Sequence, residues 1–130
     1  MLGRILIVED ELIIAEHLAI TLKRHGYEVT GICSSGRAAI DLSKEHQPDL
    51  ALIDVRIEGD LNGAETAVQI KKLFDVPVPV VFLTALPHEK FPVPVELDFY
   101  SYLRKPITDE DLIDAIQRGL ACIQESRPGL

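Results

Sequence analysis

The sequence has few of the features that mark a secreted or membrane-bound protein. It contains only two cysteines, Cys33 and Cys122, which lie far apart with no motif between them. This favours a reduced intracellular protein in which both cysteines pack as small apolar groups. No apolar run is long enough to cross a bilayer, and the chain enters an apolar strand almost at once, without a signal-peptide pattern. We therefore expect a cytoplasmic protein, or a cytoplasmic part of one, with no membrane contact.

Positive charge is also scarce. The chain has 13 lysines and arginines against 21 acidic residues, a formal net charge of −8, and no basic stripe. Because a nucleic-acid backbone would be repelled by such a surface, we expect no nucleic-acid partner for this domain. The 130 residues, 47% hydrophobic and 26% charged, predict one soluble globular domain with a sizeable core.

Apolar runs alternate along the chain with segments of helical periodicity. The predicted strands cover residues 5–8, 28–32, 50–53, 80–83 and 102–104, of which 28–32 alternates like a half-buried edge strand. Helices are predicted over about residues 11–24 and 36–46, from residue 62 onward and from residue 108 onward. Nearly continuous apolar strands are typical of a parallel sheet covered on both faces, and right-handed crossovers place helices on both sides. The pattern predicts a doubly wound α/β fold with a five-stranded sheet, and leaves the strand order open.

Two of these helices begin with capping signals. Asn62 is followed three residues later by Glu65, which predicts a capping box. Thr108, with Asp111 at the third position, predicts a hydroxyl cap on the last helix.

Polar side chains follow four of the predicted strands. They are Glu9 and Asp10, Asp54, Thr84, and Lys105. The carboxyl ends of parallel strands meet at one edge of the sheet, so the carboxylates would crowd together if the first and third strands are neighbours, and a cation would be needed to offset their charge. Mg²⁺ suits an all-oxygen site of this kind. The set matches a carboxylate that accepts a phosphoryl group: Asp54 would form an aspartyl phosphate, and Thr84 and Lys105 would bind phosphate oxygens. A cis bond before Pro106 would aim Lys105 into the site.

Five motifs resemble the receiver domain of two-component response regulators over nearly the whole chain. They are ILIVEDE at 5–11, PDLALIDVRI at 48–57, NG at 62–63, VVFLTA at 80–85 and YLRKP at 102–106. The resemblance implies a flavodoxin-like sheet with strand order 2-1-3-4-5. It also implies a receiver domain over residues 1–126, with 127–130 as a frayed tail or the start of a linker.

The same resemblance implies roles for particular residues. Asp54 would be the phosphoacceptor, and Mg²⁺ would be bound by Asp10, Asp54 and the backbone carbonyl of Arg56, with Glu9 reaching the metal through water. Thr84 and Tyr102 would form a switch pair, in which phosphate draws the hydroxyl inward and the aromatic ring follows from an exposed to a buried position.

The chain departs from the family pattern in two places. The loop 57–61 is about one residue longer than usual and lacks the common proline. In residues 86–96, where the family has its fourth helix, Pro92 and Pro94 each remove a backbone donor, at roughly 3 kcal/mol inside a helix. We therefore expect a fourth helix that is short or irregular, and do not carry over the family mode of dimerisation through this surface.

These observations predict a phosphorylatable switch of a phosphorelay, not an enzyme, whose only chemistry is self-phosphorylation and self-dephosphorylation at Asp54. Its partners would be a histidine kinase or phosphotransfer protein and a downstream protein that the sequence does not identify. The alternative is a receiver-fold protein-binding module that acts without phosphorylation. The intact acidic set argues against this alternative, while the altered fourth helix leaves it open. An aspartate-nucleophile phosphatase is rejected. Such an enzyme has its nucleophilic aspartate on the first strand and a second aspartate two residues later, whereas this chain has Glu9-Asp10-Glu11 there.

Overall fold

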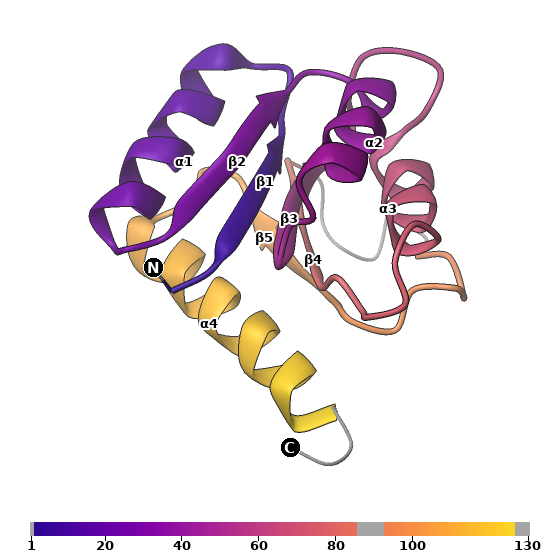
Figure 1. The fold of residues 1–130 in the computed structure, drawn as a ribbon. Coiled ribbons are helices and arrows are strands. Elements are labelled where there is room, and N and C mark those ends of the chain that lie inside the picture. The colour runs from indigo at the N-terminus through magenta and orange to yellow at the C-terminus, as the bar shows by residue number, and fades with distance from the viewer. Residues whose placement is uncertain (1, 86–92, 127–130) are drawn as a thin grey trace.

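Five parallel strands form one sheet in the computed structural model, which describes residues 2–85 and 93–126; the predicted tail at 127–130 lies outside these ranges. The elements, in chain order, are β1 (Arg4–Val8), α1 (Leu12–Arg24), β2 (Glu28–Cys33), α2 (Gly36–Glu45), β3 (Leu50–Asp54), α3 (Gly63–Lys71), β4 (Val80–Thr84), β5 (Tyr100–Arg104) and α4 (Asp109–Ser126). The spatial order is β2-β1-β3-β4-β5 with every neighbouring pair parallel (Figure 1). This confirms the predicted doubly wound sheet and its order.

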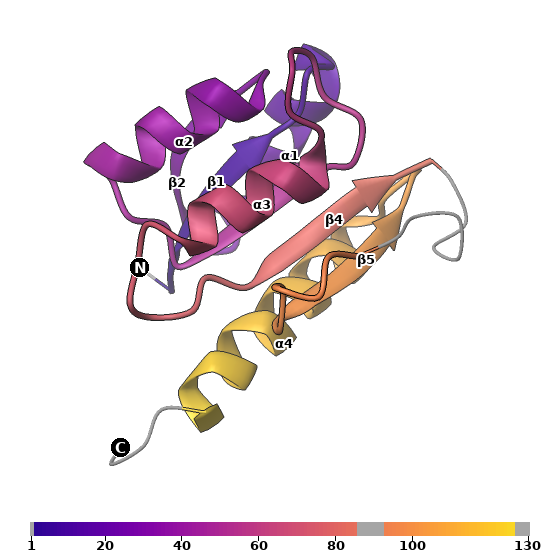
Figure 2. The same cartoon turned by 90° about the vertical axis from the view of Figure 1, so that its right-hand side faces the viewer.

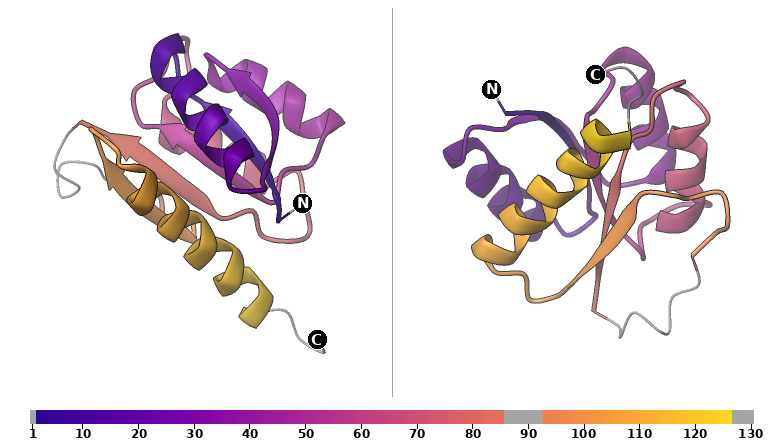
Figure 3. Two further views of the ribbon diagram at one scale, coloured as in Figure 1. Left: turned by 90° about the vertical axis from the view of Figure 1, so that its left-hand side faces the viewer. Right: turned by 90° about the horizontal axis from the view of Figure 1, so that it is seen from below.

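Helices cover both faces of the sheet. Helices α2 and α3 pack on one face, and α1 and α4 pack on the other (Figures 1 and 2). The left view of Figure 3 looks onto the second face, where α1 and α4 lie in front of the strands. Side chains alternate between the two cores, so that Ile5 and Ile7 face α1 and α4 while Leu6 and Val8 face α2 and α3. Within the described residues, no helix is long and apolar enough to cross a membrane.

The predicted capping signals are present at both helix starts. The Asn62 side chain accepts a hydrogen bond from the Glu65 backbone N–H at 2.8 Å, and the Glu65 side chain accepts one from the Asn62 N–H at 3.0 Å. At the start of α4 the Thr108 hydroxyl accepts a hydrogen bond from the Asp111 N–H at 3.1 Å. Because each capping bond satisfies a backbone donor that the helix leaves free, these residues set where α3 and α4 begin.

The connection between β4 and β5 is only partly described. Residues 86–92, the first part of the expected short or irregular helix, lie outside the described residues. Residues 93–99 contain no helix in the structure; the Leu97 N–H donates to the Pro94 carbonyl at 3.1 Å in a single turn. Leu97 is 8% exposed and belongs to the core beneath α2 and α3, whereas Val95 at the turn is 93% exposed. Within residues 93–99, Leu97 is thus part of this core, and Val93 packs against it partly buried.

The two cysteines differ in their surroundings. Cys33 is buried at the end of β2, and this burial raises the pKa of its thiol. Cys122 is exposed on α4, so the prediction that both cysteines pack as apolar groups is wrong for this residue. The reason is helical geometry: Leu112, Ile116 and Ile123 occupy the buried face of α4, and position 122 is turned away from that face.

Candidate functional site

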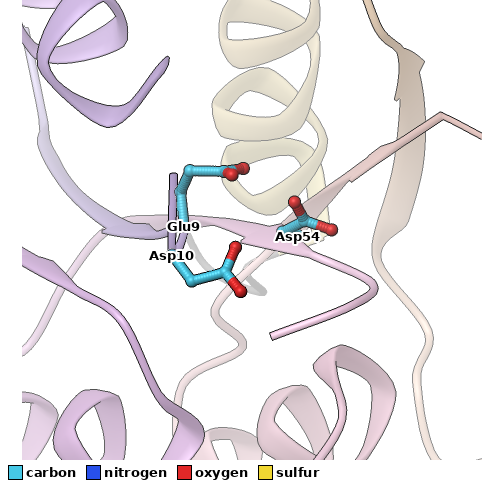
Figure 4. Close-up of side chains that lie close together, drawn as sticks. All are labelled: Glu9, Asp10 and Asp54. Atoms are coloured by element: carbon cyan, nitrogen blue, oxygen red, sulfur yellow. The ribbon is translucent and has the colours of Figure 1, made fainter. Parts of the chain in front are cut away.

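Three carboxylates meet at the carboxyl edge of the sheet. Glu9 and Asp10 directly follow β1, and Asp54 is the last residue of β3. Since β1 and β3 are neighbours, with Val8 paired to Ile53, the carboxylates come together: one oxygen from each lies within 4.8 Å of the others. The side chains point into a common space (Figure 4). The structure thus brings together the acidic residues that the sequence singled out.

Lys105 pairs with two of these carboxylates from the end of the edge strand β5. It follows β5, and its backbone N–H donates to the Thr84 carbonyl at 2.8 Å. Its ammonium nitrogen lies 2.6 Å from Asp54 Oδ2 and 3.0 Å from Glu9 Oε2. Burial opposes the positive charge, but the pairs with Asp54 and Glu9 outweigh it and raise the pKa of Lys105. The bond between Lys105 and Pro106 is cis, the form considered above for aiming Lys105 into the site.

Burial disfavours the charged form of the Glu9 carboxyl. The residue is 1% exposed, and burial raises the pKa of its carboxyl to about 7, with Asp54 adding to the shift and Lys105 opposing it. Glu9 Oε2 lies near the Lys105 ammonium, yet it accepts no well-directed hydrogen bond from the described residues. A buried oxygen left in this way beside two further carboxylates fits a hard cation such as Mg²⁺, which takes oxygen ligands and water.

The backbone holds Asp54 as well. Its Oδ1 accepts a hydrogen bond from the Arg56 N–H at 2.8 Å, while Oδ2 contacts Lys105. The carboxylate borders a cavity of about 340 Å³, whose lining residues are Asp10, Glu11, Asp54, Val55, Arg56, Thr84, Ala85 and Lys105. Thr84, at the end of β4, is 1% exposed. An oriented carboxylate in contact with a cation and open to a cavity can act as a nucleophile toward a small electrophilic group.

Tyr102, the other predicted member of the switch pair, lies outside this cavity. The side chain is half-buried on β5, with its ring centroid 6.0 Å from that of Phe82 and 5.9 Å from that of Tyr100. Phe82 stands two residues before Thr84 on the neighbouring strand β4. Thr84 and Tyr102 are therefore close in the sheet, on adjacent strands, but only Thr84 borders the site.

One acidic residue of the site was given no role by sequence reasoning. Glu11 lines the cavity, and its Oε1 lies 3.8 Å from the Lys105 ammonium. It is also the residue that precedes α1, and its side chain makes no capping bond, since glutamate is not among the preferred N-cap residues. The sequence signal for a role of Glu11 in the site was its position directly after Glu9 and Asp10. Because Glu11 also begins the predicted helix over 11–24, it was interpreted as a helix residue.

Comparison with known proteins adds the family. The response regulator receiver domain family matches residues 5–117. The transcriptional regulatory protein PdtaR of Mycobacterium tuberculosis is 33% identical over 124 residues, which cover 94% of this chain and 58% of PdtaR. The chain thus spans little more than half the length of this relative.

Solved structures of similar fold include two receiver domains and one N-terminal domain. The signal receiver domain of a modulated diguanylate cyclase from Desulfovibrio desulfuricans, described as an example of alternate folding, has a TM-score of 0.87 at 29% identity, covering 98% of this chain and 100% of that one. The N-terminal domain of a response regulator/sensory box/GGDEF three-domain protein from Carboxydothermus hydrogenoformans gives 0.81 at 32%, with 94% and 97% covered. The receiver domain of the hybrid histidine kinase CckA gives 0.75 at 28%, with 91% and 99% covered. With the family match across most of its length, this chain belongs to the response regulator receiver domain family.

Proposed function

We propose that this receiver domain is a phosphorylatable switch of a two-component phosphorelay, in which Asp54 accepts a phosphoryl group from a histidine kinase or a phosphotransfer protein. The observation that carries the proposal is the environment of the Asp54 carboxylate. One oxygen is oriented by the Arg56 N–H at 2.8 Å, the other lies 2.6 Å from the Lys105 ammonium, and the group borders an open cavity. Such a carboxylate is held in one orientation and is close to a cation that can bind the product.

In the proposed reaction an Asp54 oxygen forms a bond to phosphorus, and the bond from phosphorus to the donor histidine nitrogen breaks. The leaving imidazole nitrogen keeps the electron pair and is protonated, and the product is an aspartyl phosphate. The Lys105 ammonium then exchanges part of its contact with Asp54 for a phosphate oxygen. The Thr84 hydroxyl, at the edge of the same cavity, donates a hydrogen bond to another phosphate oxygen.

A divalent cation fits the acidic side of the site. Asp10, Asp54 and the backbone carbonyl of Arg56 would bind Mg²⁺ directly, and Glu9 would contact it through water. The support is the cluster of carboxylate oxygens within 4.8 Å and the buried Glu9 Oε2 that accepts no well-directed hydrogen bond from the described residues. When bound, Mg²⁺ would offset the charge of the carboxylates and of the incoming phosphoryl group.

The proposed output is a change of shape and not a released product. Phosphate would draw the Thr84 hydroxyl toward the site. The Tyr102 ring, on the adjacent strand β5, would then move to a more buried position. Support comes from the position of Tyr102, half-buried against Phe82 two residues before Thr84. A downstream protein, in a cytoplasmic setting, would recognise the altered surface. Self-phosphorylation and self-dephosphorylation at Asp54 are the only reactions in this proposal.

The test compares two matched aspartate substitutions. With acetyl phosphate and Mg²⁺, the parent and Asp41→Asn, which alters an exposed position on α2, should each gain one phosphoryl group by intact-mass analysis. Asp54→Asn should gain none, because the amide is not a nucleophile. An adduct that persists in Asp54→Asn would remove Asp54 as acceptor. If no protein is modified, by this donor or by a phosphorylated histidine kinase, the alternative of a binding module that acts without phosphorylation would stand instead.

A further inference from the structure

Glu11 differs from the other carboxylates of the site in being exposed. Its side chain is 66% exposed, while those of Asp54 and Glu9 are 7% and 0% exposed. It nevertheless lines the cavity that leads to Asp54. A phosphodonor that enters this cavity must therefore approach the Glu11 carboxylate while both groups are still surrounded by water.

Among the described residues, the Glu11 side chain contacts the Lys105 ammonium at 3.8 Å and does not cap α1, where glutamate is not a preferred residue. That ammonium already contacts Asp54 at 2.6 Å and Glu9 at 3.0 Å, so the third carboxylate adds little to holding the lysine. What Glu11 does add is a negative charge at the mouth of the cavity.

The acidic residues of the site are Glu9, Asp10, Glu11 and Asp54, against the cations Lys105 and Arg56. A bound Mg²⁺ would bring these charges close to balance, so the effect on a donor comes from the position of the exposed Glu11 carboxylate at the mouth of the cavity and not from the net charge. We infer that Glu11 is a specificity-determining residue that disfavours phosphodonors of high negative charge, and so favours a phosphoryl group carried on a neutral or cationic group such as a histidine ring. The inference rests on the proposed function, since it concerns the donor to Asp54.

Two small phosphodonors separate charge from chemistry. Acetyl phosphate is a dianion at neutral pH, and phosphoramidate is a monoanion. With either, an Asp54 oxygen bonds to phosphorus; acetate leaves with the electron pair from the first, and the protonated nitrogen leaves as ammonia from the second. Coulomb's law in water at a separation of roughly 7 Å gives about a threefold effect for each unit of donor charge. Neutralising Glu11 should therefore change the ratio of the two rates about threefold at low salt.

The experiment measures Asp54 phosphorylation by intact mass at saturating Mg²⁺, with each donor, for the parent and three variants. Glu11→Gln should react about threefold faster with phosphoramidate and faster still with acetyl phosphate. Glu11→Asp keeps the charge and should retain the parental ratio. Glu45→Gln removes the same charge from the end of α2, away from the carboxyl edge of the sheet, and should also retain it. In about 1 M salt the preference of Glu11→Gln should shrink, because a Debye length near 3 Å screens exposed charges.

The outcomes distinguish this inference from the proposed function. If Glu11→Gln keeps the parental ratio, or if Glu45→Gln changes it equally, Glu11 does not select donors by charge, even though Asp54 is still the acceptor. If Glu11→Asp behaves as Glu11→Gln does, then side-chain length and not charge is responsible, and the inference is also wrong. An adduct that survives in Asp54→Asn would instead contradict the proposed function itself.

Discussion

Like charges at the edge of the sheet should cost the folded chain stability when no cation is bound. Asp10 shares a space with Glu9 and Asp54, with their oxygens within 4.8 Å. We expect Asp10→Asn to raise the free energy of unfolding of the metal-free protein by about 0.5–1 kcal/mol, because the amide relieves this repulsion. The melting temperature should rise with it. Thermal unfolding followed by circular dichroism, in the presence of a chelator, measures the change.

The same variant should lose its response to metal. The parent should gain stability on addition of Mg²⁺, since a ligand that binds only the folded state stabilises it, while Asp10→Asn should gain much less. Asp41→Asn has the same charge change on the exposed part of α2 and should behave as the parent in both conditions. Equal Mg²⁺ responses in all three proteins would mean that Asp10 is not a ligand.

The two cysteines should react at different rates. Cys122 is exposed, whereas Cys33 is buried and has a raised pKa, so its thiolate is both inaccessible and scarce. We expect iodoacetamide to modify Cys122 at least ten times faster than Cys33 in the folded protein, and both equally in urea. Peptide mass mapping over time measures the two rates, and rapid native labelling of Cys33 would contradict its burial.

At the scale of elements, the start of α3 packs directly against the end of β3. A Cβ added to Gly63 would clash with the backbone carbonyl of Asp54 and lie 2.8 Å from the Val55 Cα. We expect Gly63→Ala to destabilise the fold by about 1–3 kcal/mol and to slow phosphorylation, because the backbone that carries Asp54 must shift. Urea unfolding and the intact-mass assay measure the two effects.

A second glycine provides the comparison for that prediction. A Cβ at Gly3 would meet the end of the Leu120 side chain at 3.2 Å, which can move by a few tenths of an ångström. Gly3→Ala should therefore change stability less than Gly63→Ala, and should leave the phosphorylation rate at the parental value. If both substitutions slow phosphorylation to the same degree, the contact between α3 and β3 is not what positions Asp54.

In the described part of the connection before β5, Leu97 is the buried core residue. Leu97 is 8% exposed, and Val95, two residues earlier, is 93% exposed. Leu97→Ala should lower the free energy of unfolding by about 2–4 kcal/mol through the lost burial and the cavity left behind. Val95→Ala should change it by less than about 0.5 kcal/mol. Urea titrations of both variants test whether Leu97 stabilises the core beneath α2 and α3.

At the scale of the whole molecule, a signal must pass from the cavity to β5. Thr84 borders the site, and Tyr102 is on the next strand with its ring near Phe82. With Mg²⁺ and beryllofluoride, a phosphate mimic, the parent and Thr84→Ser should show large NMR shifts at Tyr102, since both have a hydroxyl. Thr84→Ala should bind the mimic and show smaller shifts at Tyr102. Full shifts in Thr84→Ala would mean that the hydroxyl does not couple the site to the tyrosine.

The sequence by itself determined the order of the elements and the chemistry at their ends. Apolar runs and helical periodicity are local properties, so the strands, and the capped starts of α3 and α4, could be placed without coordinates. The polar residues after the strands followed from the same pattern, because a residue that ends a parallel strand is at the sheet edge wherever that strand lies. Strand order did not follow from periodicity, and came from resemblance to a family.

Only the tertiary structure decided which of these groups touch. The contacts of Lys105 with Asp54 and Glu9, at 2.6 and 3.0 Å, join residues from three different strand ends. The role inferred for Glu11 and the exposure of Cys122 were likewise absent from the sequence pattern. The physical reason is that periodicity fixes the face of an element, whereas a distance between residues far apart in the chain depends on which elements pack side by side and how closely.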